Sequence, residues 1–305
     1  MRVVISGGTG FIGRALISRL NTENHSLIVL TRNGQKAGIL SGKSIEIREW
    51  DGRTLGDWAR AVDGADAVVN LAGEPLDARR WTKRQKERIV ASRVEATRAI
   101  VQAIDKASMK PAVLVSGSAV GYYGPVEEGE VTEEWKRGRG FLAETCEKWE
   151  AEAQMAVRLG VRVATLRTGV VLGDDGGALR KMILPFKLFV GGPLGSGRQW
   201  FPWIHRVDVV AAILLAIESL SGPINLAAPD TVTMREFCTA LGKALHRPSW
   251  APVPGFILRA ILGEMSEMIL TGQKVIPEKL LRHGYTFKFD SLDAALADIV
   301  ERRNR

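Results

Sequence analysis

The glycine-rich start of the chain, VVISGGTGFIG over residues 3–13, constrains its fold more than any other stretch. A short β-branched run stops at Gly7, the chain passes Gly10, and a helical pattern begins around Gly13. Glycine permits positive φ and lets a ligand approach the bare backbone, and the N-terminus of the following helix offers free N–H groups and a positive dipole end. In this strand-to-helix context the motif predicts a binding site for the pyrophosphate of a dinucleotide. A glycine turn that holds no ligand is the alternative.

The first half of the chain alternates strand-like with helix-like segments, which is typical of a parallel sheet covered on both faces. The sequence therefore predicts an α/β fold, a Rossmann-type doubly wound parallel sheet with a smaller, mixed α/β C-terminal substrate lobe. Ligands of such sheets bind beyond the carboxyl ends of the strands. The strands expected after the first are Leu27–Thr31, Ile45–Glu49, Ala67–Leu71, Ala112–Ser116 and Val161–Leu166. The expected helices cover 11–22, Lys83–Lys106, Gly140–Leu159, Val207–Leu220 and Met234–Leu245.

Changes in composition suggest how the chain is divided. We expect the dinucleotide-binding domain over 1–172, with a return to the sheet through parts of 200–230. Glycine-rich loops after Gly173 mark the start of substrate-lobe segments, which we place over 173–248. A stretch rich in Leu, Ile and Met follows Pro248, and we expect a helical C-terminal domain over 249–300.

Composition also narrows the class of protein. No apolar run is long enough to span a bilayer, and the N-terminus is not typical of a signal peptide. Cys146 and Cys238 form no disulfide framework, so we expect a cytoplasmic protein with no membrane partner. The four histidines are scattered and show no metal-ligand spacing, and we expect no metal.

Basic residues give the chain a net charge of +8, and many of them lie between Arg79 and Arg98. No recognised nucleic-acid-binding motif accompanies them, so we interpret most of them as a solvated helix face and expect no nucleic-acid partner. A small ligand rich in phosphate would explain the remaining positive charge as well as a nucleic acid would.

Thr31 and Arg32, which follow the second predicted strand, indicate which dinucleotide is bound. A site that prefers NAD usually has Asp or Glu near this position, where it accepts hydrogen bonds from the ribose 2′-hydroxyl. Here Arg32 could instead hold a 2′-phosphate through charge-assisted hydrogen bonds. The sequence therefore favours NADP(H), against the alternative that Arg32 is an exposed loop residue.

Several motifs occur in an order that resembles the extended short-chain dehydrogenases/reductases of the NAD(P)-dependent epimerase/dehydratase type. They are GGTGFIG at 7–13, NLAG at 70–73, SGSAVGYYG at 116–124 and RTGVVLG at 167–173. More narrowly, SRVEAT at 92–97, GGPLGSGRQWFPWIH at 191–205 and GQKVIP at 272–277 resemble the SDR39U subfamily. Its members carry a C-terminal domain of unknown function of the DUF1731 type, which the resemblance places at 249–300.

The resemblance implies a cofactor site residue by residue. Within it, Arg93 replaces an Asn that many extended members carry, and Val171 would lie near the nicotinamide. The strand end at Leu71, Ala72 and Gly73 would lie against the adenosine side. The pyrophosphate cradle and the 2′-phosphate site would consist of Gly7, Gly10, Phe11, Ile12, Gly13, Thr31 and Arg32.

The helix expected to carry catalytic residues departs from the wider family. Those enzymes use Ser or Thr together with Tyr and Lys spaced YxxxK, where one helical turn brings the ammonium near the phenol and lowers its pKa. The corresponding stretch, GRGFLAETCEKWEAEA over 138–153, contains no Tyr. Phe141 or Leu142 stands where Tyr is expected, and Thr145 or Cys146 stands where Lys is expected.

The remaining candidates for chemistry are polar or aromatic residues near the predicted cleft. Ser118, or else Ser116, can fill the Ser position, and either Tyr122 or Tyr123 could replace the missing acid–base group unless both are structural. Glu144 is a further polar candidate, whereas the pair His205 and Asp208 is more typical of a structural hydrogen bond. The aromatic residues near the predicted cleft either stack on a ring of the substrate or wedge the small lobe against the sheet; they are Trp200, Phe201 and Trp203.

We therefore expect an NADP(H)-binding epimerase-family protein, an oxidoreductase or epimerase that acts on an unidentified small molecule such as a nucleotide sugar. The alternative is a non-catalytic, NADP(H)-sensing regulator linked to cell division, as relatives of this subfamily in plastids and cyanobacteria are. The resemblance also implies a homodimer through the helices expected at Lys83–Lys106 and Gly140–Leu159.

Overall fold

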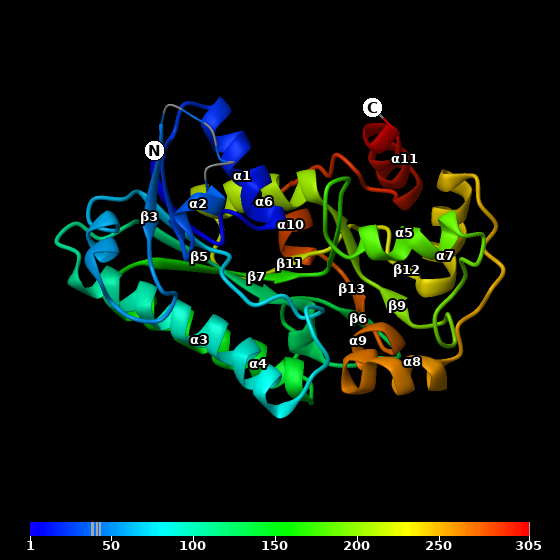
Figure 1. Ribbon diagram of the computed structural model, residues 1–305. Helices are drawn as coiled ribbons and strands as arrows, with labels where there is room; N and C mark the ends of the chain where they lie inside the picture. Colours follow the sequence, from blue (N-terminus) through cyan, green and yellow to red (C-terminus); the bar gives the residue numbers. More distant parts are fainter. Residues whose placement is uncertain (38–39, 41, 43, 305) are drawn as a thin grey trace.

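The computed structural model describes residues 1–37, 40, 42 and 44–304. Within that part of the chain, a seven-stranded parallel sheet runs through the larger half of the molecule (Figure 1). The strand order is β3-β2-β1-β4-β5-β7-β11, so the direction of winding reverses between β1 and β4. The strands are β1 (Arg2–Ser6), β2 (Ser26–Thr31), β3 (Ile45–Glu49), β4 (Ala67–Asn70), β5 (Val113–Ala119), β7 (Arg162–Thr168) and β11 (Gly222–Leu226). The predicted Rossmann-type fold is confirmed.

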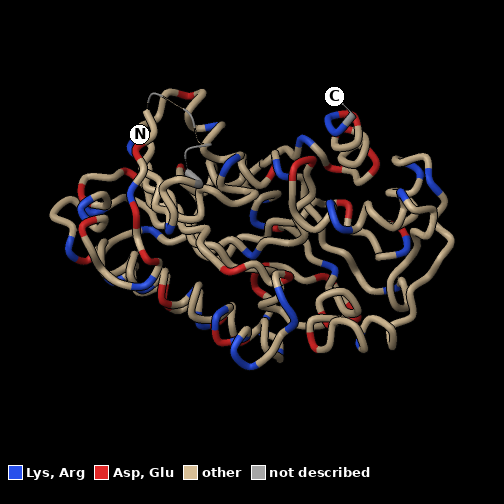
Figure 2. The backbone as a smooth tube through the Cα atoms, in the orientation of Figure 1, with Lys and Arg blue, Asp and Glu red and all other residues tan. Residues whose placement is uncertain are grey.

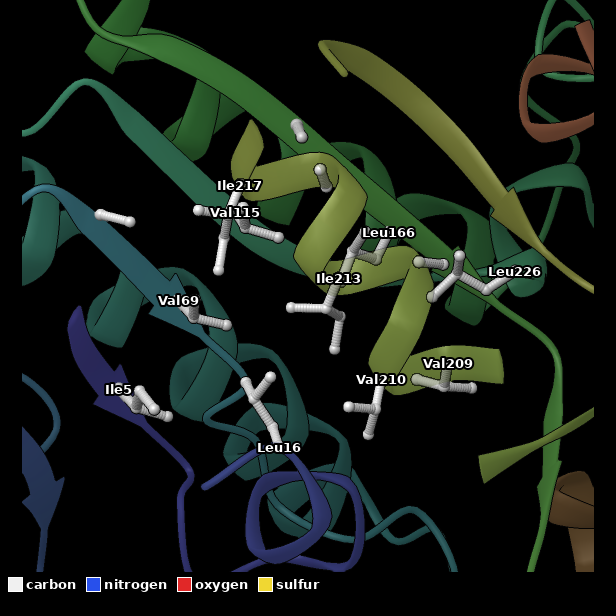
Figure 3. Packing of buried hydrophobic residues seen from close by; sticks show 14 of the residues in the cluster. Ile5, Leu16, Val69, Val115, Leu166, Val209, Val210, Ile213, Ile217 and Leu226 are labelled. Carbon is white, nitrogen blue, oxygen red and sulfur yellow. The ribbon is translucent and has the colours of Figure 1, made fainter. Parts of the chain in front are cut away.

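Helices cover both faces of the sheet because alternate strand residues point to opposite sides. Val3 and Ile5 belong to the core shared with α1 (Phe11–Thr22) and α6 (Arg206–Glu218), whereas Val4 belongs to the core shared with α3 (Lys83–Lys106). Figure 3 shows the apolar side chains of α6 facing those of β5, β7 and β11. The neighbour of α3 on its face is α4 (Phe141–Gln154), and a 3₁₀ turn then takes the chain to Leu159.

A smaller lobe with its own core extends beyond the carboxyl edge of the sheet. It contains the short parallel pair β8 (Val170–Leu172) and β10 (Trp203–His205), and the antiparallel pair β9 (Trp200–Phe201) and β12 (Val232–Thr233). Three helices surround the core of this lobe: α5 (Leu179–Lys187), α7 (Met234–Leu245) and α11 (Leu292–Asn304).

The stretch before α11 shares its apolar residues with the rest of the protein. Val275 lies in a cluster with Tyr123, and Leu280 and Phe287 lie in the core beneath α6. The elements of this stretch are α8 (Gly255–Leu262), α9 (Glu267–Leu270), β13 (Lys274–Val275), which pairs with β6 (Glu130–Val131), and α10 (Glu278–Arg282). Its packing thus ties the C-terminal stretch to both the sheet and the smaller lobe.

Charged residues of both signs are interspersed along the trace, including along α3 (Figure 2). Lys86 pairs with Glu264 and Arg98 pairs with Glu152, so part of the basic face of α3 is neutralised. Among the described residues, no helix combines the length and apolar character that crossing a membrane requires.

Candidate functional site

The glycine loop after β1 is packed so closely that side chains would not fit in it. Gly7 has a φ of 70°, and a Cβ atom there would lie 2.5 Å from the carbonyl oxygen of Leu71. A Cβ atom on Gly13 would collide with the carbonyl oxygen of Gly7. The amide of Gly10 donates to that same oxygen at 2.9 Å. Glycine is therefore required at Gly7 and Gly13 for the loop to fold back against the end of β4.

The N-terminus of α1 opens toward this loop without a capping side chain. Within the described part of the chain, the first-turn amides of Phe11, Ile12 and Gly13 have no acceptor. Free amides at the positive end of a helix dipole form a binding site for an anion.

A cleft of 570 Å³ lies over the carboxyl ends of β1, β2 and β4. The predicted cofactor residues that line it are Gly7, Gly10, Thr31, Arg32, Leu71, Ala72 and Gly73. The cleft is also lined by residues that sequence reasoning missed, among them Asn33, Trp50, Asp51, Arg53 and Ser92. The signal that could have revealed Trp50 and Asp51 is their position directly after β3, at the same edge of the sheet.

Arg32 is exposed at the mouth of this cleft, and its side chain passes within 4.0 Å of a Cβ built on Gly52. The described residues give its guanidinium no ion pair and no hydrogen bond. Beside it, the hydroxyl of Thr31 accepts the amide of Asn33 at 3.3 Å and closes a short turn. Hydrogen bonds from Thr54 lower the pKa of Asp51, the nearby cleft carboxylate. The positive charge of Arg32 is thus available to a ligand.

The other predicted cofactor residues do not line the cleft themselves. The ring of Phe11 packs against the loop at Gly173 and Gly177, with the guanidinium of Arg206 4.7 Å from its centroid. Val171 lies in β8, paired with Ile204, and the guanidinium of Arg93 lies beside Gly73, which lines the cleft. Ile12 and Gly13 likewise face inward.

At the end of β5, a hydrogen-bonded group surrounds Ser118, one of the residues predicted to take part in chemistry. Ser118 donates to a carboxylate oxygen of Glu150 at 2.6 Å. Arg167 holds the same carboxylate through two bonds of 2.9 Å. Sequence reasoning missed Glu150 and Arg167, although Glu150 lies one helical turn after Cys146 on α4. The Ser118 hydroxyl is therefore oriented by a carboxylate that is itself fixed by a guanidinium.

The two candidate tyrosines differ sharply in their surroundings. Tyr123 is 1% exposed, donates to Asn225 at 2.6 Å and accepts from Arg167 at 3.1 Å. Burial raises its pKa to about 12, which favours a structural role. Tyr122 is only half-buried, its ring stacks 3.6 Å from the Arg167 guanidinium, and its hydroxyl has no hydrogen-bond partner within the described part of the chain. Of the two, Tyr122 is the one with a free hydroxyl.

On α4, the positions expected for Tyr and Lys are occupied by groups that cannot perform acid–base chemistry there. Leu142 packs against Gly121, and Thr145 donates to the carbonyl of Phe141 at 2.6 Å. Cys146 is buried beside Ser118, and burial raises the pKa of its thiol to about 11. The thiol is therefore protonated at neutral pH.

The remaining candidates do not lie in the cleft. Ser116 is fully buried within β5, and Glu144 lies on the outer surface between α3 and α4. Trp203 is buried and donates to the carbonyl of Asp230 at 2.7 Å, and Phe201 packs against Phe237. These last two aromatic residues wedge the smaller lobe in place, while Trp200 is half-buried beside Lys274.

His205 and Asp208 connect the start of α6 to the C-terminal stretch. Nδ1 of His205 accepts the amide of Val207 at 3.2 Å, and its ring packs 4.0 Å from that of Phe289. Asp208 accepts the amides of Lys288 and Phe289 at 2.7 and 3.1 Å. Burial raises the pKa of Asp208, opposed by those hydrogen bonds. Through these contacts His205 and Asp208 have the structural role that is more typical of such a pair.

Burial lowers the pKa of His205 from 6.5 to about 4, so the folded protein keeps this imidazole neutral. Its stabilising effect is complete above the unfolded pKa and is lost as the pH falls from 6.5 toward 4. We expect a loss of about 2 kcal/mol in unfolding free energy between about pH 6.5 and pH 5. Denaturant titrations should show this loss in the wild type and a smaller one in His205→Asn. The control His246→Asn, at an exposed position with left-handed backbone, should show the same loss as the wild type. If the unfolding free energy falls equally with pH in all three proteins, His205 is not the group responsible.

Comparisons with known proteins agree with this geometry. The model of the NAD dependent epimerase/dehydratase family matches residues 3–227, and a domain of unknown function, DUF1731, matches 253–299. The chain is 45% identical to the chloroplastic epimerase family protein SDR39U1 homolog of Arabidopsis thaliana, over 99% of this chain and 87% of that protein. It is 38% identical to the epimerase family protein YfhF of Bacillus subtilis, over 99% of both chains.

A solved structure extends the similarity to three dimensions. Human epimerase family protein SDR39U1 (isoform 2), crystallised with NADPH, matches with a TM-score of 0.88 and 38% identity over 99% of both chains. The chain therefore belongs to the NAD dependent epimerase/dehydratase family and, within it, to the epimerase family proteins of the SDR39U1 type.

Proposed function

We propose that this protein binds NADP(H) in the cleft over β1, β2 and β4, and acts as an oxidoreductase or epimerase on a small molecule. The observation that carries the cofactor assignment is the guanidinium of Arg32 at the mouth of the cleft, which has no ion pair with any described residue. A guanidinium at this position suits a 2′-phosphate, which NADP(H) has and NAD(H) lacks. The NADPH of the human relative supports the same choice.

The residues of the cleft fit such a cofactor. The free amides of the first turn of α1 would bind its diphosphate, and the bare backbone at Gly7 and Gly10 would allow close approach. Leu71 and Ala72 would contact the adenosine side. When bound, NADPH supplies a hydride, and the residues of the chain must position and protonate the substrate. Phe11 and Val171 would support the site from behind.

Proton transfer at this site cannot follow the Tyr–Lys pattern, because α4 offers no such pair. We assign the hydroxyls of Ser118 and Tyr122 to substrate contact. The hydroxyl of Tyr123 already donates one hydrogen bond within the protein and accepts another. The missing pair is also the observation that favours the second candidate function, an NADP(H) sensor without catalysis. A screen of small metabolites for NADPH oxidation, and with NADP⁺ for epimerised products, separates the two functions.

The proposed cofactor is tested by titrating the purified protein with NADPH and NADH while following nicotinamide fluorescence. Because one charge-assisted contact contributes about 1.5–3 kcal/mol, we expect NADPH to bind about 10- to 100-fold more tightly than NADH. Failure of both cofactors to bind at millimolar concentration would exclude the enzyme and the sensor together. Equal affinities would show that Arg32 does not read the 2′-phosphate.

A further inference from the structure

Residues 272–279 of the C-terminal stretch lie between the two lobes and pack against both of them. Their strand β13 pairs with β6, which follows β5 in the chain (Figure 1). On the other side, Gly272 packs against β9 of the smaller lobe, where a Cβ atom would lie 1.9 Å from the carbonyl oxygen of Trp200. Only glycine allows two backbones to approach so closely. The segment therefore has a fixed place beside the chain that follows β5.

Side chains alternate between the two sides of this segment, as they do in any strand. Val275 is fully buried, whereas Lys274 is partly exposed and pairs with Glu130 at 2.9 Å. Gln273 shares the inner side with Val275 and is only 7% exposed. A buried amide destabilises the folded protein unless it finds a hydrogen-bond partner, so the contact that Gln273 makes is the reason for a polar side chain at this position.

The partner of Gln273 is the 3₁₀ turn at the end of β5, η2 (Val120–Tyr123), which carries both candidate tyrosines. Nε2 of Gln273 donates to the carbonyl oxygen of Val120 at 2.7 Å, across 153 positions of the sequence. Shortly after the turn, the amide of Val126 donates to the carbonyl oxygen of Gly272 at 3.1 Å. Two hydrogen bonds thus connect the turn and the chain after it to the C-terminal stretch.

The two tyrosines of η2 depend on this connection to different degrees. Tyr123 is held by its own hydroxyl, which donates to Asn225 and accepts from Arg167. The hydroxyl of Tyr122 has no partner in the described part of the chain, and its ring only stacks on the guanidinium of Arg167 at 3.6 Å. Stacking on a cation tolerates a wider range of geometries than a hydrogen bond does. The place of the Tyr122 hydroxyl is therefore set mainly by the backbone of η2.

We propose that Gln273 is a positioning residue of the active site: by binding the Val120 carbonyl it fixes η2 and so places the Tyr122 hydroxyl for contact with the substrate. The stretch that matches DUF1731 thereby completes a site that α4 leaves without a Tyr–Lys pair. This inference rests on the proposed function, because it takes Tyr122 as a group that contacts the substrate.

Because the chain has only three Tyr residues, fluorine NMR of the full-length protein labelled with 3-fluorotyrosine tests this directly. Single Tyr→Phe variants assign the signals of Tyr122, Tyr123 and Tyr285. Gln273→Met keeps the length of the side chain and removes the donor, and we expect it to shift the Tyr122 signal by more than its own linewidth or to broaden it. The Tyr123 signal should move less, and that of Tyr285, which donates to Asp208, should not move.

A second readout connects the turn to the bound cofactor. The nicotinamide of NADP⁺ carries a positive charge that NADPH lacks, so a tyrosine in the active site should give different signals in the two complexes. We expect this difference for Tyr122 in the wild type, and a smaller one in Gln273→Met. The affinity for NADPH should change by less than about twofold, because neither Gln273 nor Val120 lines the cleft.

Two further variants separate positioning from a general effect on the fold. The matched control Lys274→Gln changes the neighbouring side chain and removes its ion pair with Glu130, but leaves the bond of Gln273 to Val120 in place. It should give the Tyr122 signals of the wild type. Gln273→Asn keeps the amide on a shorter side chain and should fall between the wild type and Gln273→Met. If Gln273→Met does not fold, Gln273→Asn provides the same comparison.

Two results would overturn the inference. One is a folded Gln273 variant with the Tyr122 signal of the wild type, because the bond would then stabilise the protein without placing the tyrosine. The other is a wild type that binds both NADP⁺ and NADPH and gives the same Tyr122 signal with each. Both differ from a failure of the proposed function, in which the wild type binds neither cofactor.

Discussion

Replacing Arg32 by aspartate is expected to weaken NADPH binding by about 100-fold and to leave NADH binding unchanged or stronger. The arginine has no ion pair or side-chain hydrogen bond among the described residues, so its removal breaks no polar contact with them. Aspartate adds repulsion of the 2′-phosphate and offers an acceptor to the ribose hydroxyl of NADH. Fluorescence titration of both cofactors measures the switch in preference.

Arg32→Gln is the matched control for this change, because it removes the charge without adding repulsion. It should weaken NADPH by about tenfold and have little effect on NADH. Thermal denaturation of both variants should match the wild type, since the side chain is exposed. Equal loss of NADPH and NADH in either variant would mean that Arg32 shapes the cleft and does not read the phosphate.

Replacing Arg167 by methionine is expected to lower the free energy of unfolding by about 3–5 kcal/mol. The side chains of Arg167 and Glu150 are only 5% and 12% exposed, so the change leaves a carboxylate buried without its counter-charge. The hydroxyl of Tyr123 and the carbonyl of Glu133 also lose a donor, each at 3.1 Å. Denaturant titration near neutral pH measures the loss.

The double variant Arg167→Met with Glu150→Gln separates the stranded charge from the lost hydrogen bonds. Removing the unpaired carboxylate should recover about 1–2 kcal/mol relative to the single variant. A cost below about 1 kcal/mol for Arg167→Met would show that water or another group already solvates Glu150. The same network orients Ser118, so its loss should also disturb that hydroxyl.

Elements with strong local signals were predicted closely. The helix expected at Lys83–Lys106 forms with those bounds because Thr82 caps it, accepting the amide of Gln85 at 3.2 Å, and Ala107 is extended. The helix expected at Gly140–Leu159 ends earlier, at Gln154, where the chain continues as a 3₁₀ turn. Its apolar pattern continues through the turn, and periodicity alone does not distinguish the two.

Side-chain roles at the site were harder to predict than the strands that carry them. The motif resemblance assigns Phe11 and Val171 to the cofactor site; in the structure the ring of Phe11 packs against the loop at Gly173 and Gly177, and Val171 pairs with Ile204 of β10. A motif specifies where the backbone goes, but which way a side chain turns depends on what other segments place beside it. Trp50 and Asp51 enter the cleft because β3 lies next to β2.

The first β-strand, the glycine loop and the helix after it could be predicted from the sequence alone, because the steric demands of Gly7 and Gly13 are local. The sequence also placed Arg32 directly after a strand whose end faces the ligand. The chemical surroundings of Ser118, in contrast, depend on how distant segments pack together. Glu150 lies 32 residues from Ser118 and 17 from Arg167, and whether a charge finds a partner depends on such distant packing.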